Sequence, residues 1–235
     1  MSNSSFQFRQ FTIAHDRCAM KVGTDGVLVG AWAELPDTGR VLDVGTGSGL
    51  IALMVAQRAP AVDVTAIDID SSSVEQAREN VAASSFATRI EVRRQSLQEL
   101  ATGDESFNAI VCNPPFFEEN LLPPDAARSK ARHATALTFE ELIAATVRLL
   151  SNDGSFSVIL PVNAFEGFRR LCFAAGLCIK RSRLVQGTAK KAPKRILATF
   201  SKGDAEWVQE KPLVLNERDG RSEDYAALTS DFYLW

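Results

Sequence analysis

The chain has 235 residues, of which 46% are hydrophobic and 23% are charged, and its formal net charge is -3. This is the composition of a globular protein with a sizeable core, and its charge excludes an overall basic surface, so any nucleic-acid contact must come from local basic clusters. The N-terminal residues Met-Ser-Asn-Ser-Ser lack the apolar run of a signal peptide, and no apolar run reaches the roughly 20 residues of a membrane span, so we expect a cytoplasmic protein.

The first 35 residues hold two patterned stretches. Apolar residues alternate with polar ones from residue 6 to residue 13, which predicts a short strand-like arm ahead of the main sheet. Further on, Gly23 and Gly26 permit a tight turn, and Thr24 or Asp25 is placed to cap a helix that follows. The alternative to a ligand-binding role is that this segment is only a loop followed by an amphipathic helix, and local chemistry does not exclude it.

A strand, a glycine loop and a helix come next. The apolar residues 41–44 lead into the loop 45–49 (Gly-Thr-Gly-Ser-Gly), and a helical pattern covers residues 50–58, which Pro60 stops. This order begins a βαβ unit that binds a nucleotide, because the loop lets backbone approach a ligand at the carboxyl end of the strand. Residues 47–52 match part of the dinucleotide fingerprint GxGxxA. The loop alone therefore fits NAD and S-adenosylmethionine equally well.

The next predicted strand, residues 62–67, ends in Asp68. We expect its carboxylate to accept hydrogen bonds from both ribose hydroxyls of a nucleotide. Helix capping is the alternative for Asp68 and Asp70, since residues 72–75 (Ser-Ser-Val-Glu) have a capping-box pattern. The position of Asp68 at a strand end, where ligands of such folds lie, favours the ribose role.

Strands and helices keep alternating in the rest of the chain. Residues 138–141 form a capping box, with Leu137 and Leu142 placed as a hydrophobic staple, and open a helix that runs to about residue 150. The other predicted elements are helices at 74–83 and 165–175, strands at 90–92, 107–112 and 154–160, strands at 177–185 and 195–200 that pair antiparallel, and an added strand and helix at 213–215 and 225–232. The alternation predicts an α/β protein with one doubly wound, mostly parallel sheet.

The strand at residues 107–112 leads directly into Asn113-Pro114-Pro115-Phe116. Each proline fixes its own φ and restricts the residue before it, so this turn is stiff. The Asn113 side-chain oxygen and the Pro114 carbonyl oxygen can accept hydrogen bonds from an NH2 group, and Phe116 can stack on the ring that carries it. The turn thus offers what chemistry on an exocyclic amine requires. A proline-rich loop with Asn113 as a turn former is the alternative.

Two basic clusters are candidates for contacts with RNA phosphates. They are Arg128, Lys130, Arg132 and His133 after the proline turn, and Lys190, Lys191, Lys194 and Arg195 between two predicted strands. Both are expected at the ligand edge of the sheet, although solvated surface loops are the alternative. For His133 a base role is also conceivable, but an exposed histidine beside Arg132 is more often a contact residue.

The cysteines do not indicate a metal site or a disulfide framework, since none of the four has CxxC spacing. Cys112 and Cys172 lie in apolar runs and are predicted to be core residues. We expect a monomer that binds no metal and no membrane.

Together the motifs resemble those of class I S-adenosylmethionine-dependent methyltransferases that methylate amines. The resemblance rests on Asp43-x-Gly45-x-Gly47-x-Gly49, on Asp68 and on the turn that begins at Asn113. Nearly the whole chain is similar to a narrower family, the bacterial tRNA1(Val) adenine-37 N6-methyltransferases. The segment 11–32 is the most specific part of that similarity, and the tail 225–234 also fits.

The resemblance implies a Rossmann-like class I methyltransferase fold with a mostly parallel seven-stranded sheet and an antiparallel hairpin. We expect a single domain made of an N-terminal extension (1–35), a core (36–200) and a C-terminal strand and helix (201–235). The resemblance also implies S-adenosylmethionine as cofactor, and we expect contacts at Lys21, Thr24, Asp25, Asp43, Gly45, Gly47, Gly49, Asp68, Ile69, Ser96 and Asn113. One departure is that related enzymes often contact the cofactor adenine through an acidic residue where this chain has Gln95 and Ser96.

The implied reaction is methylation of the N6 amine of adenine 37 in the anticodon loop of a valine tRNA. Asn113, Pro114, Pro115 and Phe116 would form the catalytic turn, in which two oxygens accept hydrogen bonds from the amine N–H groups and the reaction rate comes from positioning and electrostatics. Two alternatives stay open. Enzymes with an NPP(F/Y) turn also methylate the glutamine amide of a release factor, and a non-catalytic RNA-binding or assembly protein would not need the turn.

Overall fold

The computed structural model describes residues 4–18, 20–101, 106–114, 137–218 and 220–234. Within these residues the helices are α1 (Thr24–Trp32), α2 (Leu50–Arg58), α3 (Ser71–Ala82), α5 (Phe139–Leu149), α6 (Val162–Ala174) and α7 (Glu223–Thr229), with a 3-10 turn at Ala87–Arg89. The strands are β1 (Ser5–Gln7), β2 (Thr12–Ala14), β3 (Gly39–Val44), β4 (Val62–Asp68), β5 (Ile90–Arg94), β6 (Phe107–Cys112), β7 (Leu150–Pro161), β8 (Leu177–Gln186), β9 (Arg195–Lys202), β10 (Val208–Gln209), β11 (Leu213–Val214), β12 (Asn216–Glu217) and β13 (Gly220–Arg221).

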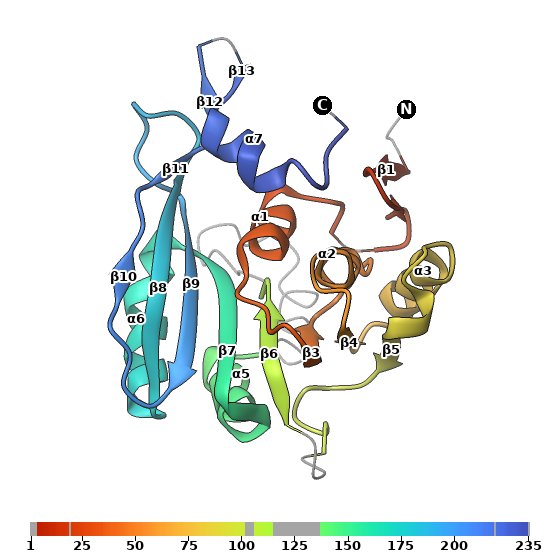
Figure 1. Cartoon of the computed structure of the whole chain (residues 1–235). Helices are drawn as coiled ribbons and strands as arrows, with labels where there is room; N and C mark the ends of the chain where they lie inside the picture. The colour runs from red at the N-terminus through yellow and green to blue at the C-terminus, as the bar shows by residue number, and fades with distance from the viewer. Residues whose placement is uncertain (1–3, 19, 102–105, 115–136, 219, 235) are drawn as a thin grey trace, which may run out of the picture.

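One sheet organises the described residues (Figure 1). Its strands follow the order β10-β8-β9-β7-β6-β3-β4-β5, and β11 also pairs with β8. Strands β3 to β7 are parallel, whereas β9 runs antiparallel to both β7 and β8. The prediction of a mostly parallel α/β sheet of seven strands with an antiparallel hairpin is confirmed, and the two-residue strands β10 and β11 extend it to nine.

Helices cover both faces of this sheet, with α1, α2 and α3 on one face and α5 and α6 on the other (Figure 1). Alternate residues of the central strands face the two layers. In β3, Val41 belongs to the hydrophobic cluster under α1, α2 and α3, and Leu42 belongs to the cluster under α5 and α6. Cys112 and Cys172 are buried in the second cluster, as predicted.

The starts of the helices test the capping predictions. Thr138 and Glu141 form the expected capping box at α5. The cap of α3 is Asp70, which accepts a hydrogen bond from the Ser73 backbone N–H at 2.8 Å, so the capping alternative holds for Asp70, while residues 72–75 lie inside the helix. The prediction for α1 is wrong, because the N-cap is Gly23 without a side-chain bond and Thr24 and Asp25 are already helical.

Gly26 does not serve a turn, as the sequence suggested, but lies inside α1. A Cβ atom at this position would come within 3.1 Å of the Leu50 side chain, and one at Gly30 would come within 2.8 Å of Met54. The two glycines therefore let α1 pack closely against α2, so helix packing and not turn formation explains them.

The two ends of the chain pack together (Figure 1). The predicted strand-like arm is a hairpin of β1 and β2 that reverses between Phe8 and Phe11, where the Phe8 N–H donates to the Phe11 carbonyl at 2.8 Å. The Phe8 ring stacks on Tyr233 with 5.7 Å between centroids, and the Arg9 N–H donates to the Phe232 carbonyl. The hairpin thus lies against the segment that follows α7.

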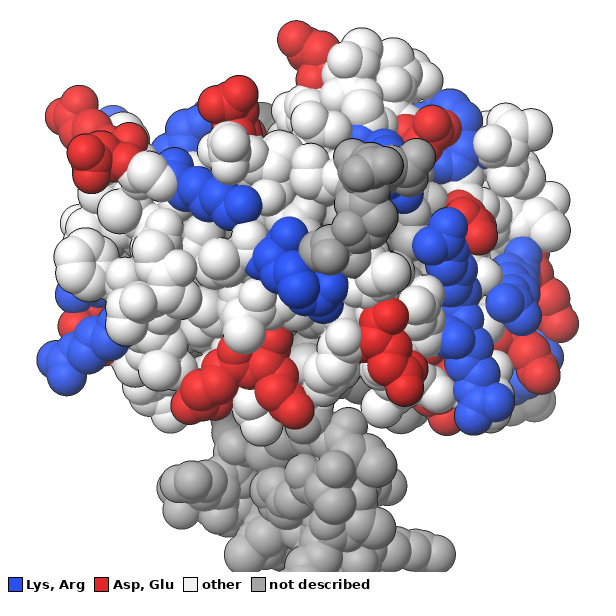
Figure 2. Space-filling view, turned by 90° about the horizontal axis from the view of Figure 1, so that it is seen from below, with Lys and Arg blue, Asp and Glu red and all other residues white. Residues whose placement is uncertain are grey.

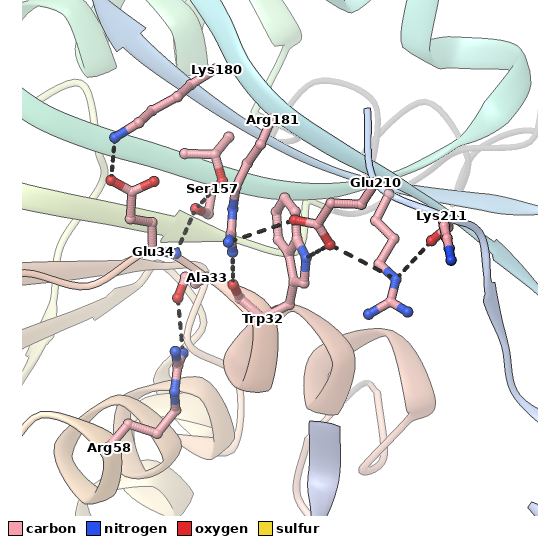
Figure 3. Close-up of polar contacts among 11 residues, drawn as sticks. Trp32, Ala33, Glu34, Arg58, Ser157, Lys180, Arg181, Glu210 and Lys211 are labelled. Atoms are coloured by element: carbon pink, nitrogen blue, oxygen red, sulfur yellow. Dashed lines mark hydrogen bonds and ion pairs between the residues drawn. The ribbon is translucent and has the colours of Figure 1, made fainter. Parts of the chain in front are cut away.

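Helix α1 is fastened to the sheet at both ends. At its carboxyl end the Arg181 guanidinium lies 3.9 Å from the centre of the Trp32 ring, while the Trp32 ring N–H donates to Glu210 at 3.1 Å (Figure 3). At its amino end Asp25 pairs with Arg195 at 2.8 Å. Since Arg181 lies on β8 and Arg195 lies on β9, the antiparallel pair of β8 and β9 sets the position of α1.

No helix in the described part of the chain is long and apolar enough to cross a membrane.

Candidate active site

Three neighbouring strands bring three motifs to one level at the carboxyl edge of the sheet. Ile67 of β4 pairs with Val44 of β3, and Val44 pairs with Cys112 of β6. The residues that follow these three are Asp68, Gly45 and Asn113. Because neighbouring strands lie about 4.8 Å apart, the acidic residue, the glycine loop and the proline turn converge on one site.

The glycine loop has the backbone conformation that only glycine adopts readily. The φ angles are +70° at Gly45, +55° at Gly47 and +82° at Gly49. A Cβ at Gly45 or Gly47 would meet no described atom within 4 Å, so the loop borders open space. The Gly45 and Thr46 N–H groups donate to the Ile67 carbonyl at 3.0 and 2.9 Å, which ties the loop to β4.

Asp43 lies completely buried beneath this loop. Its Oδ2 accepts hydrogen bonds from the Thr46 hydroxyl at 2.6 Å and from the Ala52 N–H at 3.1 Å, while Oδ1 has no partner among the described residues. Burial raises the pKa of this carboxyl to about 7, against the lowering effect of the two hydrogen bonds. A titratable carboxyl therefore lies directly beneath the glycine loop.

Asp68 is half-buried at the end of β4 and is not a helix cap. Its Oδ2 accepts from the Gly47 N–H at 2.9 Å, and its Oδ1 accepts from the Asp70 N–H at 3.0 Å. Each carboxylate oxygen keeps a second lone pair for a ligand. The next residue, Ile69, is 51% exposed although it is large and apolar. A ribose on Asp68 and an adenine against Ile69 fit this arrangement.

We expect Asp68→Ala to weaken S-adenosylmethionine binding by about 2 kcal/mol or more, the scale of lost hydrogen bonds to a charged group. Titration calorimetry measures the change directly. The matched control is Asp70→Ala, which removes the cap of α3 and should cost roughly 1 kcal/mol of stability without changing the affinity. An unchanged affinity for Asp68→Ala would refute the ribose assignment.

Gln95 and Ser96, which stand where related enzymes often have an acidic residue, lie next to Asp68. The Gln95 N–H donates to the Asp68 carbonyl at 3.0 Å, which fixes the segment after β5 beside the end of β4. The Ser96 hydroxyl donates to the Glu99 carboxylate at 2.8 Å. Glu99 thus brings an acidic group to this place from three residues further along, and the sequence pattern gave no signal for it.

The N-terminal residues predicted to contact the cofactor lie around the start of α1. Lys21 and Thr24 are exposed, and Asp25 is half-buried in its pair with Arg195. Asp25 is predicted to contact the cofactor and Arg195 is predicted to contact RNA, so each of these residues already has an ionic partner within the chain.

The proline turn is described only in part. Asn113 is half-buried and Pro114 is buried. The predicted residues Pro115, Phe116, Arg128, Lys130, Arg132 and His133 lie outside the described residues.

The second basic cluster lies at the same edge as the strand ends. Arg195 pairs with Pro161, the last residue of β7, and with Val185 near the end of β8. Lys190, Lys191 and Lys194 are exposed in the loop between β8 and β9. The opposite edge, seen from below in Figure 2, shows basic and acidic side chains interspersed on its described part. The three lysines therefore add positive charge on the side of the candidate site.

The described residues contain no group of three His, Cys, Asp or Glu side chains that could hold a metal ion. What they do contain is the glycine loop, the buried Asp43 beneath it, the half-buried Asp68 and the exposed Ile69, at the edge where Asn113 and Pro114 follow β6. Such a site can hold S-adenosylmethionine beside an amine.

Comparisons with known proteins agree with this chemistry. Residues 23–171 match the family model described as methyltransferase small domain. A Bacteroides fragilis protein named tRNA1(Val) (adenine(37)-N6)-methyltransferase is 43% identical over 236 residues, covering 100% of this chain and 99% of that protein. Proteins of the same name from Phocaeicola vulgatus and Pseudoalteromonas translucida are 44% and 41% identical, covering 100% and 98% of this chain and 99% of each relative.

Solved structures share the fold at lower identity. A predicted O-methyltransferase from Agrobacterium tumefaciens matches with a TM-score of 0.66 at 21% identity, covering 88% of this chain and 96% of that one. The glycopeptide N-methyltransferase MtfA, solved with S-adenosylmethionine, matches with a TM-score of 0.58 at 13% identity, covering 78% of this chain and 100% of that one.

Proposed function

The chain belongs to the family of tRNA1(Val) (adenine(37)-N6)-methyltransferases, and we propose on this premise that it transfers a methyl group from S-adenosylmethionine to N6 of adenine 37 in a valine tRNA. The observation that carries the proposal is the common level of Asp68, the glycine loop and Asn113 at the carboxyl edge of the sheet. This common level supports a nucleotide site directly beside two oxygens that can accept hydrogen bonds from an amine.

The cofactor supplies an electrophilic methyl group on a positively charged sulfur. We assign its ribose to Asp68, its adenine to the exposed Ile69 and to Ser96 with Glu99, and its positive charge to the field of the buried Asp43. The glycine loop lets the backbone approach closely, since its positive φ angles turn the chain without side chains.

The residues Asn113 and Pro114 would orient the substrate amine. The Asn113 amide oxygen and the Pro114 carbonyl oxygen each accept one N–H, which leaves the nitrogen lone pair free to point along the axis of the reacting methyl group. The lone pair of an adenine amine is delocalised into its ring, so orientation and electrostatics are what the protein has to supply. No covalent intermediate with the protein is required.

We assign the contacts with tRNA phosphates to Lys190, Lys191 and Lys194. They are exposed at the edge that holds the site, whereas Arg195 is engaged by Asp25. The same edge carries every described residue that we assign to the reaction, which supports a chain that acts as a monomer. A tRNA substrate places the reaction in the cytoplasm.

Reversing the charge of Lys190, Lys191 and Lys194 should weaken tRNA binding and flatten its dependence on salt, with the slope falling by about 0.7–0.9 for each lost phosphate contact. Binding titrations between low and high salt measure the slope. The control is Arg170→Glu, because Arg170 is exposed on α6 away from this edge. A slope equal to that of the wild type would make the three lysines ordinary surface residues.

The substrate itself is tested by nucleoside mass spectrometry of tRNA from cells with and without the gene. We expect N6-methyladenosine to disappear from one valine tRNA and to return with the wild-type gene but not with Asn113→Ala. An unaltered tRNA profile together with lost methylation of a release-factor glutamine would instead support the alternative amide substrate. A full return of the modification with Asn113→Ala would contradict the proposed catalytic turn.

A further inference from the structure

Helix α3 buries two amide side chains that the reaction does not use. Gln76 is 1% exposed and Asn80 is 5% exposed. They lie one helical turn apart on the face that meets the segment after β2. Buried amides need their hydrogen bonds satisfied, so their partners show which segments this face joins.

Asn80 joins two segments that are far apart in the sequence. Its Nδ2 donates to the Ala14 carbonyl and to the Ser48 carbonyl, both at 2.8 Å, and its Oδ1 accepts from the Ala14 N–H at 3.0 Å. Ser48 belongs to the glycine loop, and Ala14 is the last residue of β2. Both donor hydrogens and one acceptor lone pair of a single buried amide are therefore used to hold the N-terminal hairpin against the glycine loop.

The contacts of Gln76 provide a useful contrast. Its Oε1 accepts from the N–H and the Nε of Arg17, both at 3.4 Å. Gln76 thus holds the same N-terminal segment, with longer hydrogen bonds, but in the described part of the chain none of its bonds reaches the glycine loop. The link between the two halves of the site runs through Asn80.

The glycine loop is held from both sides. On one side the Thr46 hydroxyl donates to Asp43 at 2.6 Å, and on the other the Ser48 carbonyl accepts from Asn80. The segment that follows Ala14 leads to Lys21, Thr24 and Asp25 at the start of α1, with the Val22 N–H donating to His15 at 3.4 Å on the way. Any shift of Ala14 against Ser48 would change the distance between this segment and the loop.

We propose that Asn80 is a positioning residue for the cofactor site. By fixing Ala14 against Ser48 it sets the spacing between the described residues that lead to the start of α1 and the glycine loop, so that both contact the same S-adenosylmethionine molecule. This inference rests on the proposed function only in the identity of the cofactor. Asn80 is buried and its three bonds all go to the backbone of its own chain, so it would act through these two segments and not by binding a ligand itself.

The test compares Asn80→Ala with Gln76→Ala by calorimetric titration of S-adenosylmethionine in the absence of RNA. Asn80→Ala loses the link between Ala14 and Ser48, so its Kd for S-adenosylmethionine should rise about tenfold or more, as expected for lost buried hydrogen bonds. Gln76→Ala keeps this link, so its Kd should rise by less than about threefold. With tRNA, the KM for the cofactor should rise in Asn80→Ala while kcat changes little. Because calorimetry needs no RNA, this result does not depend on which substrate is methylated.

A merely structural role would lower the melting temperature of both variants and leave both Kd values equal to that of the wild type, which would overturn the proposal. Equal rises in the two variants would overturn it as well. Asn80→Ser serves as a second variant if Asn80→Ala does not fold. A serine hydroxyl is uncharged and has a single donor hydrogen, so it cannot donate to both the Ala14 and the Ser48 carbonyl, and the Kd must rise in it too.

Discussion

Replacing Asn113 by alanine is expected to lower kcat roughly 100-fold, the cost of removing one preorganised electrostatic group from an active site. The Kd for tRNA should change by less than about threefold, because the bonds of Asn113 to the amine matter most while the nitrogen is being methylated. Single-turnover measurements at saturating tRNA and cofactor separate this effect from binding. Near-normal turnover would mean that the amine is oriented by other groups.

The same strand offers a matched control for this experiment. Asn108 lies on β6 at the opposite edge of the sheet, where its side-chain oxygen accepts from the Arg40 N–H at 2.9 Å. Asn108→Ala also removes an amide from β6, but it should leave kcat near that of the wild type, with at most a modest loss of stability. A similar fall in kcat for both variants would indicate a general disturbance of the strand instead of a role for Asn113 in catalysis.

Local patterns in the sequence predicted the central elements well. The strand before Asp68, the strand before Asn113 and the helix at residues 50–58 appear where their apolar patterns placed them. These elements are buried on both sides or bounded by proline and glycine, so short-range signals decide them. The site at their carboxyl ends follows from parallel pairing alone, which explains why Asp68 and the glycine loop could be brought together in advance.

Contacts between distant residues could not be predicted in this way. Asp25 and Arg195 are separated by 170 positions, and each residue by itself is a plausible ligand contact until the other is placed beside it. Asn80 is another example, because in the sequence it is only a polar residue inside a helical pattern. Its role depends on two backbone segments that α3 contacts in the fold, and the periodicity of the sequence does not predict these contacts.

The buried carboxyl of Asp43 leads to a second large effect, on stability as a function of pH. Its pKa rises from 3.8 to about 7 on folding, chiefly because burial disfavours the charged form. A carboxyl with a raised folded-state pKa contributes stability that is fully present below the unfolded pKa and is lost as the pH rises through the folded pKa. Between about pH 4 and pH 7 the free energy of unfolding of the protein without cofactor should therefore fall, because Asp43 ionises.

We expect the unfolding free energy of the wild type, relative to Asp43→Asn, to fall by on the order of 4 kcal/mol between pH 4 and pH 8, at about 1.4 kcal/mol per pKa unit. The asparagine oxygen can take over both hydrogen bonds from Thr46 and Ala52, but its side chain does not ionise. Urea denaturation of both proteins across this pH range gives the difference between their unfolding free energies. Taking this difference cancels the titration of all groups that the two proteins share.

The exposed Asp63→Asn provides a control, whose unfolding free energy should differ from that of the wild type by no more than about 0.5 kcal/mol at each pH. Saturating S-adenosylmethionine should reduce the loss, since its positive charge favours the ionised carboxylate. A pH-independent difference between wild type and Asp43→Asn would mean that Asp43 stays ionised in the folded protein throughout this range.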